Sequence, residues 1–314
     1  MGRGAKRHGR NPFGRTTGML LQQILNGTVS GAIYALFALG FTLIFGVQKL
    51  LNLAHGAIFM AGAFIAYYAT AQGLPFWFAL LLATVATGAI SVVVDFVAFR
   101  QLRKAGHAEF AAIVTSIGVD LILMNIAQQV SNTKVLSFPF GTFPVKFFSF
   151  WGMRISLLQL TILGLVLVLV LALAYYINRT SFGRQVRAVS SNEHASALLG
   201  ISASAVYRQT FFIAGALAGL AGVLIGLSFN SIHFMMGEPF LLQAFVVVVI
   251  GGLGSLQGAV VAAILIGIIQ SLTIAYLSSE LSTAIIFALL FVTLLFFPNG
   301  LFGRAGNYAG GSRR

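Results

Sequence analysis

Long apolar stretches, separated by short polar or charged segments, run along almost the whole chain. A helix rising 1.5 Å per residue needs about 20 apolar residues to cross a bilayer. Apolar stretches of this order, charged only at Asp95 and Asp120, cover 18–46, 53–71, 76–99, 110–131, 156–178, 209–229, 241–277 and 282–298. Strands of a membrane barrel would instead alternate in short segments. The pattern predicts an all-α fold, a polytopic integral membrane bundle of helices.

The stretch 241–277 is too long for one span and contains the glycine-rich segment 251–258. Glycine permits positive φ values and close helix contact, so we expect a turn here that divides the stretch into two helices. The predicted number of spanning segments is therefore eight or nine. Pairs of small residues at helix-packing spacing favour close contact between helices; they are Gly27 with Gly31, Gly215 with Gly219, Gly222 with Gly226, and Gly254 with Gly258.

Composition and charge exclude several classes of protein. With 58% apolar and 8% charged residues, the chain is not a soluble globule. Nineteen Lys and Arg stand against six acids, and all nineteen lie in tails, in loops or at segment ends. This is the positive-inside pattern of membrane proteins rather than a nucleic-acid surface. We expect membrane lipid, and no nucleic acid, as a partner.

The basic residues also predict the orientation. The loop at 100–104, the loop 179–208 and the tail 304–314 are the most basic, so we place them in the cytoplasm and the loop 132–155 outside. Counting back puts the start of the first helix outside, although the tail 1–17 carries five basic residues. Either the rule does not apply to this tail or 47–71 contains a re-entrant element. Three agreeing loops favour the outside placement, and the tail, which lacks periodicity, is expected to be disordered.

No enzymatic constellation is found in the sequence. There is no Cys, no HExxH zinc motif, no pair of carboxylates one helical turn apart and no phosphate-binding GxxxxGK[ST] loop. We therefore predict no catalytic residue, no metal site and no cofactor. Any active transport has to draw on an ion gradient or on a partner that hydrolyses ATP. The scarcity of intramembrane charges argues against a proton-coupled carrier.

Two polar features interrupt the apolar spans. Asp120 stands ten residues into 110–131, and an acid at that depth is a functional candidate. The alternative is a polar bridge to Asn125, to Gln128 or to another helix. The segment 46–56 brings Asn52, His55 and Gly56 between two apolar stretches. It either lines a wet cavity or forms a plain connecting turn with His55 bonded to a carbonyl, and the residues alone favour the turn.

The basic loop 179–208 is expected to contain a short helix. Ser191 or Asn192 can cap it, Glu193 lies in its first turn, and Gly200 ends it. Its apolar face would consist of Ala195, Leu198 and Leu199. Such a helix either rests on the membrane surface or is presented to a soluble partner.

Five segments in order along 21–303 resemble one family, the LivH-type permeases of branched-chain amino acid ABC importers. They are Gly31-Ala32-Ile33-Tyr34-Ala35-Leu36, Asn52-Leu53-Ala54-His55-Gly56, Gly183-Arg184 to Arg187-Ala188, Glu193-His194-Ala195 to Gly200-Ile201, and Gly251-Gly252-Leu253-Gly254-Ser255. The family's coupling loop often has Glu-Ala-Ala where this chain has Glu-His-Ala. Neither the basic N-terminal tail nor an acid at Asp120 belongs to its pattern.

The resemblance implies a permease domain at 18–303 with a cytoplasmic coupling loop at 179–208. The chain would translocate branched-chain or other hydrophobic amino acids across a bacterial or archaeal inner membrane. Its implied partners are a second permease, two cytoplasmic ATPase subunits that bind the ATP, and an extracytoplasmic solute-binding protein. Urea or short-amide importers share the resemblance. A secondary carrier or channel, with Asp120 and His55 as a relay, is the alternative from another class.

The resemblance and the residues together give two sets of candidate site residues. The implied ATPase-coupling residues are Glu193, Ala195, Leu198, Leu199, Gly200 and Ile201. The candidates for the translocation path are Asn52, His55, Gly56, Asp120, Gly251, Gly252 and Gly254.

Overall fold

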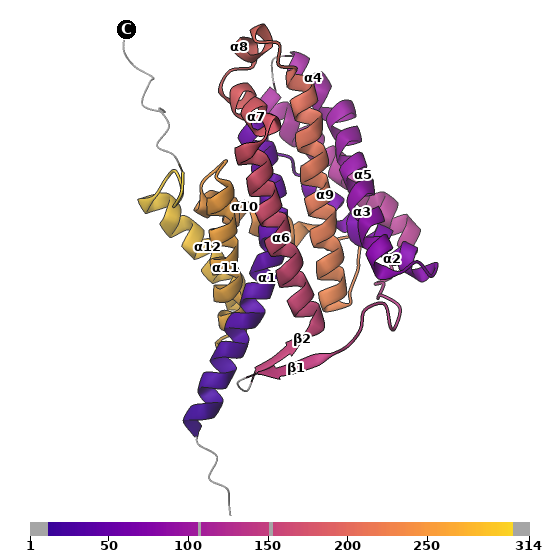
Figure 1. Cartoon of the computed structure of the whole chain (residues 1–314), viewed down its shortest axis with the longest axis vertical. Helices are drawn as coiled ribbons and strands as arrows, with labels where there is room; N and C mark the ends of the chain where they lie inside the picture. Colours follow the sequence, from indigo (N-terminus) through magenta and orange to yellow (C-terminus); the bar gives the residue numbers. More distant parts are fainter. Residues whose placement is uncertain (1–11, 106–107, 151–152, 304–314) are drawn as a thin grey trace, which may run out of the picture.

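Helices make up most of the computed structural model, which describes residues 12–105, 108–150 and 153–303 (Figure 1). In order they are α1 (Pro12–Gln48), α2 (His55–Ala71), α3 (Phe76–Val94), a π-helix η1 (Asp95–Phe99), α4 (Arg100–Ala105), α5 (Ala108–Ser131), α6 (Leu157–Arg179), α7 (Ser181–Ser191), α8 (Glu193–Leu198), α9 (Ala203–Phe229), α10 (Gly237–Gly251), α11 (Leu256–Tyr276) and α12 (Ser279–Phe296). Two short strands, β1 (Phe147–Phe150) and β2 (Met153–Ser156), form an antiparallel hairpin.

The polytopic helical membrane architecture is confirmed, but the expected count of eight or nine spans is not. Seven segments of the described chain are long and apolar enough to cross a membrane: Gly18–Gln48, Phe76–Arg103, Phe110–Ser131, Leu157–Arg179, Ala203–Phe229, Leu256–Tyr276 and Ser279–Phe296. The difference comes from α2, with 17 residues, and α10, with 15. Both fall within predicted spans, and both are too short to be counted.

The break predicted in 251–258 is confirmed. Helix α10 ends at Gly251 and α11 begins at Leu256. Between them Gly252 and Gly254 adopt positive φ values of 99° and 84°, a region that favours glycine. The Ser255 side chain then accepts a hydrogen bond from the Gly258 amide at 3.1 Å and caps α11. Gly254 therefore lies in a turn. It does not form the helix-packing pair with Gly258 that the sequence spacing had suggested.

Helices α1 and α9 occupy the centre of the bundle, whereas α5, α6 and α12 are mostly exposed at its edge. The proportion of buried residues is 83% in the α1 span and 78% in the α9 span, against 17% in each of the three edge helices. Glycines permit close approach: a Cβ on Gly27 would lie 2.6 Å from the Ile268 Cα in α11, and one on Gly62 would lie 2.3 Å from the Gly219 carbonyl oxygen in α9. The small residues at 27, 31, 215, 219 and 222 do pack helices together, as predicted.

The two ends of the bundle differ. One end carries α4, α7 and α8, and the other carries the β1–β2 hairpin and the start of α1 (Figure 1). The hairpin, which pairs Phe147 with Ser156 and Phe150 with Met153, was not predicted. Because α1 starts at the end opposite the loop 179–208, the arrangement agrees with the crossing count made from the sequence. Helix α1 begins at Pro12, inside the expected tail 1–17; residues 1–11 and 304–314 lie outside the described chain.

Candidate functional site

The loop 179–208 forms two helices at one end of the molecule. Helix α7 is amphipathic: Phe182, Val186 and Val189 are buried, whereas Arg184 and Arg187 are exposed. The chain passes from α6 to α7 at Thr180, and a Cβ on Gly183, in the first turn of α7, would lie 1.7 Å from the Ile177 carbonyl oxygen. The Arg187 guanidinium donates to that same carbonyl at 2.8 Å. These contacts hold α7 firmly against the end of α6.

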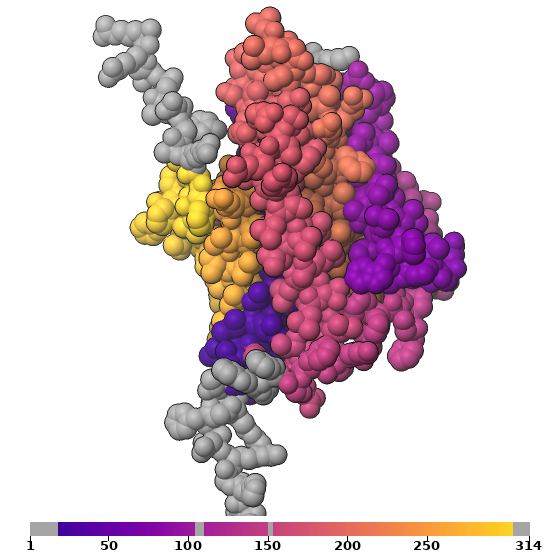
Figure 2. Space-filling view, viewed as in Figure 1, coloured from indigo at the N-terminus to yellow at the C-terminus, as the bar shows by residue number. Residues whose placement is uncertain are grey.

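Helix α8 (Glu193–Leu198) is the short helix expected between a cap at Ser191 or Asn192 and a stop at Gly200. The Asn192 side chain caps it by accepting a hydrogen bond from the Ala195 amide at 2.9 Å, and Gly200, with φ of 80°, follows its end. Leu198 and Leu199 are 90% and 79% exposed, and Ala195 is exposed beside them. Figure 2 shows this segment protruding from the end of the molecule. An exposed apolar pair held on a capped helix is suited to docking.

A second candidate region lies halfway along the bundle, where α2 and α10 both begin. The segment 49–54 approaches this point from the end that carries α8, and 230–236 approaches it from the hairpin end (Figure 1). The two helix starts touch through glycine backbones, because a Cβ on Gly237 would lie 2.2 Å from the Gly56 carbonyl oxygen. Two short helices therefore meet start to start inside the bundle, each leaving toward a different end.

Two carboxylates flank this junction. Asp120, in the middle of α5, accepts a hydrogen bond from the Ala57 amide in the first turn of α2 at 3.2 Å. Glu238 stands in the first turn of α10, next to Gly237, and its side chain is exposed. Both carboxylates therefore lie beside the N-terminus of a helix.

Asn52 and His55 lie beside the same junction and are fully enclosed. Asn52 is 1% exposed and His55 0%. The His55 Nε2 atom lies 3.3 Å from the Phe37 carbonyl oxygen, and its ring packs on Phe37 and Phe41. Within the described chain, both polar atoms of the Asn52 amide and the His55 Nδ1 atom have no hydrogen-bond partner. The carbonyl contact expected for a plain turn is present for one ring nitrogen only.

The candidate path residues do not form one group. Asn52, His55, Gly56 and Asp120 gather at the start of α10, whereas Gly251, Gly252 and Gly254 lie at and beyond its far end. There the segment 299–303 closes over the helix: the Leu301 amide donates to the Ile250 carbonyl at 2.8 Å. A Cβ on Gly252 would lie 2.5 Å from the Gly303 nitrogen. These three glycines shape a packed helix end.

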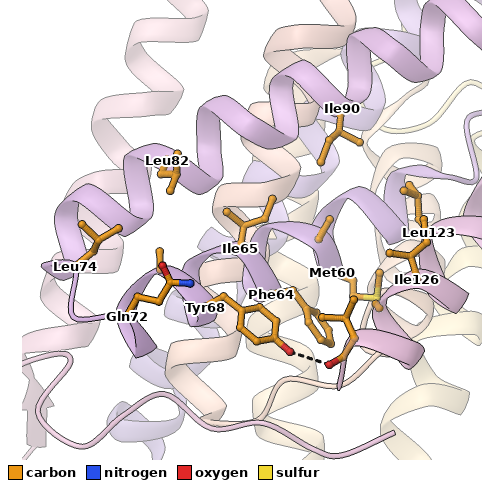
Figure 3. A pocket seen from close by; sticks show the side chains of 14 residues that line it. Met60, Phe64, Ile65, Tyr68, Gln72, Leu74, Leu82, Ile90, Leu123 and Ile126 are labelled. Carbon is orange, nitrogen blue, oxygen red and sulfur yellow. Dashed lines mark hydrogen bonds between the residues drawn. The ribbon is translucent and has the colours of Figure 1, made fainter. Parts of the chain in front are cut away.

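An apolar groove of about 440 Å³ opens between α2, α3 and α5 (Figure 3). Met60, Phe64 and Ile65 form part of its wall, and the Tyr68 hydroxyl donates to the Val130 carbonyl at 3.1 Å. Met60 and Leu123 lie one helical turn beyond Ala57 and Asp120, so the groove starts close to the helix junction. Its lining suits a hydrocarbon chain or an apolar side chain.

Comparison with known proteins identifies the family. The family model for the permease component of branched-chain amino acid transport systems matches residues 23–294, which is most of the chain. The chain belongs to this permease family. Permeases of this family are not ATPases, in agreement with the absence of a phosphate loop from the sequence.

Individual relatives agree over nearly the full length of this permease. It is 32% identical to the high-affinity branched-chain amino acid transport system permease protein LivH of Escherichia coli, over 90% of this chain and 96% of that protein. It is 31% identical to BraD of Pseudomonas aeruginosa, with the same coverage. A more distant relative is the high-affinity branched-chain amino acid transport system permease protein LivM of E. coli, at 29% identity over 88% of this chain and 70% of that protein.

Sequence reasoning missed three residues of this permease that the structure places in prominent positions. Glu238 was not singled out, although an acid followed by Pro239 and an apolar run is a signal for a helix start. Arg103 was counted only as a loop charge, and Tyr207 only as part of the loop 179–208. No sequence spacing connects Arg103 with Tyr207, whose ring lies 4.6 Å from the guanidinium.

Proposed function

We propose that this permease is the translocation subunit of a binding-protein-dependent ABC importer for branched-chain or other hydrophobic amino acids. Membership of the family, from a match over 23–294, is the observation that carries the proposal. The relatives named for high-affinity branched-chain amino acid transport support the substrate class. A secondary carrier is disfavoured for the same reason, and urea or short amides are a less favoured substrate class.

The proposed contact with the ATPase subunits is α8 with the residues that follow it. Leu198, Leu199 and Ala195 offer an apolar surface, Glu193 anchors the first turn, and Gly200 and Ile201 direct the chain back toward α9. A surface-lying helix would bury its apolar side in lipid, but α8 protrudes beyond the end of the spans (Figure 2). Two ATPase subunits would bind the ATP, one on each of two permeases, and the end carrying α8 would face the cytoplasm.

The proposed path passes the junction of α2 and α10. Of the three mostly exposed spans, α6 and α12 carry no ionisable group in their central parts, whereas α5 carries the half-exposed Asp120. Glu238, at the start of α10, is exposed near the same junction. Ionisable groups at membrane depth face a wet cavity or another protein rather than lipid. A zwitterionic solute would present its ammonium group to these carboxylates. In this proposal α2 with 49–54, and α10 with 230–236, complete two further crossings.

The remaining partners follow from the same assignment. The similarity to both LivH and LivM supports pairing with a second permease of similar fold, with the polar side of α5 and the start of α10 facing the shared path. The hairpin end, with β1 and β2, would face outward and receive the solute-binding protein. The membrane would be the inner membrane of a bacterium or archaeon.

Reconstitution into liposomes tests the proposal. Uptake of leucine, isoleucine or valine should require ATP, the ATPase subunits and the binding protein together. Uptake driven by an ion gradient with the permease alone would support the carrier instead. Urea or acetamide competing with leucine at equal concentration would shift the substrate class.

One substitution tests the role of α8. Leu199→Asp places a charge in the proposed contact, and burying it unpaired costs several kcal/mol. We expect the ATPase subunits to be lost from the purified complex, while Leu199→Met, which keeps volume and polarity, retains them. Full recovery of ATPases with Leu199→Asp would remove α8 from the contact.

A further inference from the structure

A connected set of polar side chains links α8 to four other elements at the same end of the molecule. We call it the Arg103 clamp; it consists of Glu193 in α8, Tyr207 in α9, Arg103 in α4, Asp95 at the start of η1, and Gln48 at the end of α1. Figure 1 shows α4, α8 and the start of α9 at this end. The five residues come from positions spread over the sequence from 48 to 207.

Each link of the Arg103 clamp has favourable geometry. The Tyr207 hydroxyl donates to Glu193 Oε2 at 2.9 Å, and the Arg103 guanidinium lies 4.6 Å from the centre of the Tyr207 ring. The same guanidinium donates through Nη1 to Asp95 Oδ1 at 2.7 Å and to Gln48 Oε1 at 3.0 Å. Arg103 thus contacts three elements at once through one planar, delocalised cation, which a lysine does not reproduce.

Burial makes the links among Asp95, Arg103 and Tyr207 stiff, whereas Glu193 is exposed. The Asp95 side chain is 2% exposed, the Arg103 side chain 15%, and Tyr207 5%. Removing one member of a buried ion pair leaves the other uncompensated, so the members have a strong energetic reason to move together. Asp95 also begins a π-helix, a rare turn that is frequent at functional sites.

We propose that Arg103 is a positioning residue that transmits a displacement of α8 to α1 and to the α3–η1 helix. This inference rests on the proposed function of α8 as the ATPase contact. When the ATPases push on α8, Glu193 and Tyr207 carry the displacement to Arg103. Asp95 and Gln48 then carry it into α3, which packs along α2, and into α1, whose Phe37 contacts His55 at the start of α2. Without the clamp, α8 would move independently of those spans.

The substitution Tyr207→Phe separates this role from a purely structural one. It keeps the ring beneath the Arg103 guanidinium and removes only the hydrogen bond to Glu193. We expect the ATPases to copurify in normal amounts and ATP hydrolysis to continue. The number of solute molecules transported per ATP should fall about tenfold, as for one lost hydrogen bond to a charged group. Arg103→Lys should lower the same ratio, because one ammonium cannot serve Asp95, Gln48 and the ring together.

Arg100 supplies the matched control. It lies in the same helix, it is exposed, and its guanidinium packs on the Phe96 ring at 5.1 Å outside the clamp. Arg100→Lys should leave the transport ratio unchanged. A normal ratio in both Tyr207→Phe and Arg103→Lys would overturn the proposal, as would loss of folding or of the ATPases in Tyr207→Phe.

The test also separates failure of this inference from failure of the proposed function. If Leu199→Asp releases the ATPases while Tyr207→Phe transports normally, α8 is the contact and the clamp does not transmit its movement. If Leu199→Asp leaves the ATPases bound and coupled, the assignment of α8 itself is wrong, and the clamp loses the displacement that it was proposed to carry.

Discussion

The contact between Gly56 and Gly237 provides a sharp test of the helix junction. A Cβ added to Gly237 meets much closer neighbours than a Cβ added to Gly56. A Cβ on Gly237 would lie 2.2 Å from the Gly56 carbonyl oxygen and 2.6 Å from its carbon. Both atoms belong to backbone, which cannot rotate away as a side chain does. The starts of α2 and α10 must separate by about 1.2 Å before the methyl group reaches the ordinary contact distance of 3.4 Å.

The reverse substitution is milder. A Cβ on Gly56 would lie 3.1 Å from the Gly237 carbonyl oxygen, so a shift of a few tenths of an ångström accommodates it. Overpacking of this kind typically costs about 1–3 kcal/mol, and we expect Gly237→Ala to fall in that range. Replacing glycine by alanine in a helix gains roughly 0.5–1 kcal/mol, which should leave Gly56→Ala near neutral. Gly118→Ala in α5 is the control, because no atom lies within 4 Å of a Cβ at that position.

The assay is thermal unfolding of the purified permease in detergent, followed by uptake in liposomes with its ATPases and binding protein. Gly237→Ala should unfold at a lower temperature than the other two variants and should lose most of its uptake. Gly56→Ala and Gly118→Ala should behave like the unaltered protein. Equal unfolding temperatures and equal uptake for Gly237→Ala and Gly56→Ala would refute the close start-to-start contact of α2 and α10.

Three further substitutions test other parts of the site. Asp120→Asn keeps an acceptor for the Ala57 amide, whereas Asp120→Leu leaves that amide unsatisfied. The second change should lower the free energy of unfolding by about 1–3 kcal/mol. Equal stability of the two variants would argue against the hydrogen bond. A cysteine at Asn52, in a chain without native Cys, should react with aqueous thiol reagents only during ATP turnover, and labelling unaffected by ATP would favour a sealed connecting turn. Gly200→Val puts a β-branched residue at a φ of 80° and should weaken ATPase copurification through ~1–3 kcal/mol of backbone strain; unchanged copurification would show that the end of α8 tolerates rebuilding.

The apolar pattern was sufficient to predict most helices, because burial in a bilayer demands length and hydropathy and little else. The turn at Gly252 and Gly254 was predictable for a local reason, since positive φ values favour glycine. The cap of α8 at Asn192 was predictable for the same kind of reason. The expected span count was not confirmed, because tertiary contacts decide the lengths of α2 and α10: their starts are fixed by Gly56 and Gly237, which lie far apart in sequence.

The site was less predictable than the fold. Asp120 attracted attention through its depth alone, but its partner, the Ala57 amide, depends on how α5 packs against α2. The glycines 251, 252 and 254 were grouped with Asn52 and His55, and the structure separates them by the length of α10. The Arg103 links involve residues with no shared motif, so only the packed arrangement brings them together.

The meeting of α2 and α10 also bears on how the chain is assembled in the membrane. When α2 first enters the bilayer, the Ala57 amide has no acceptor until Asp120 is synthesised, and Gly56 has no neighbour until Gly237 follows much later. The segment 49–54, which carries Lys49 and Asn52, is therefore poorly suited to lipid during most of translation. We expect this region to mature last, after the seven long spans have inserted. Substitutions at the junction should accordingly expose the young chain to membrane proteases before any transport step is reached.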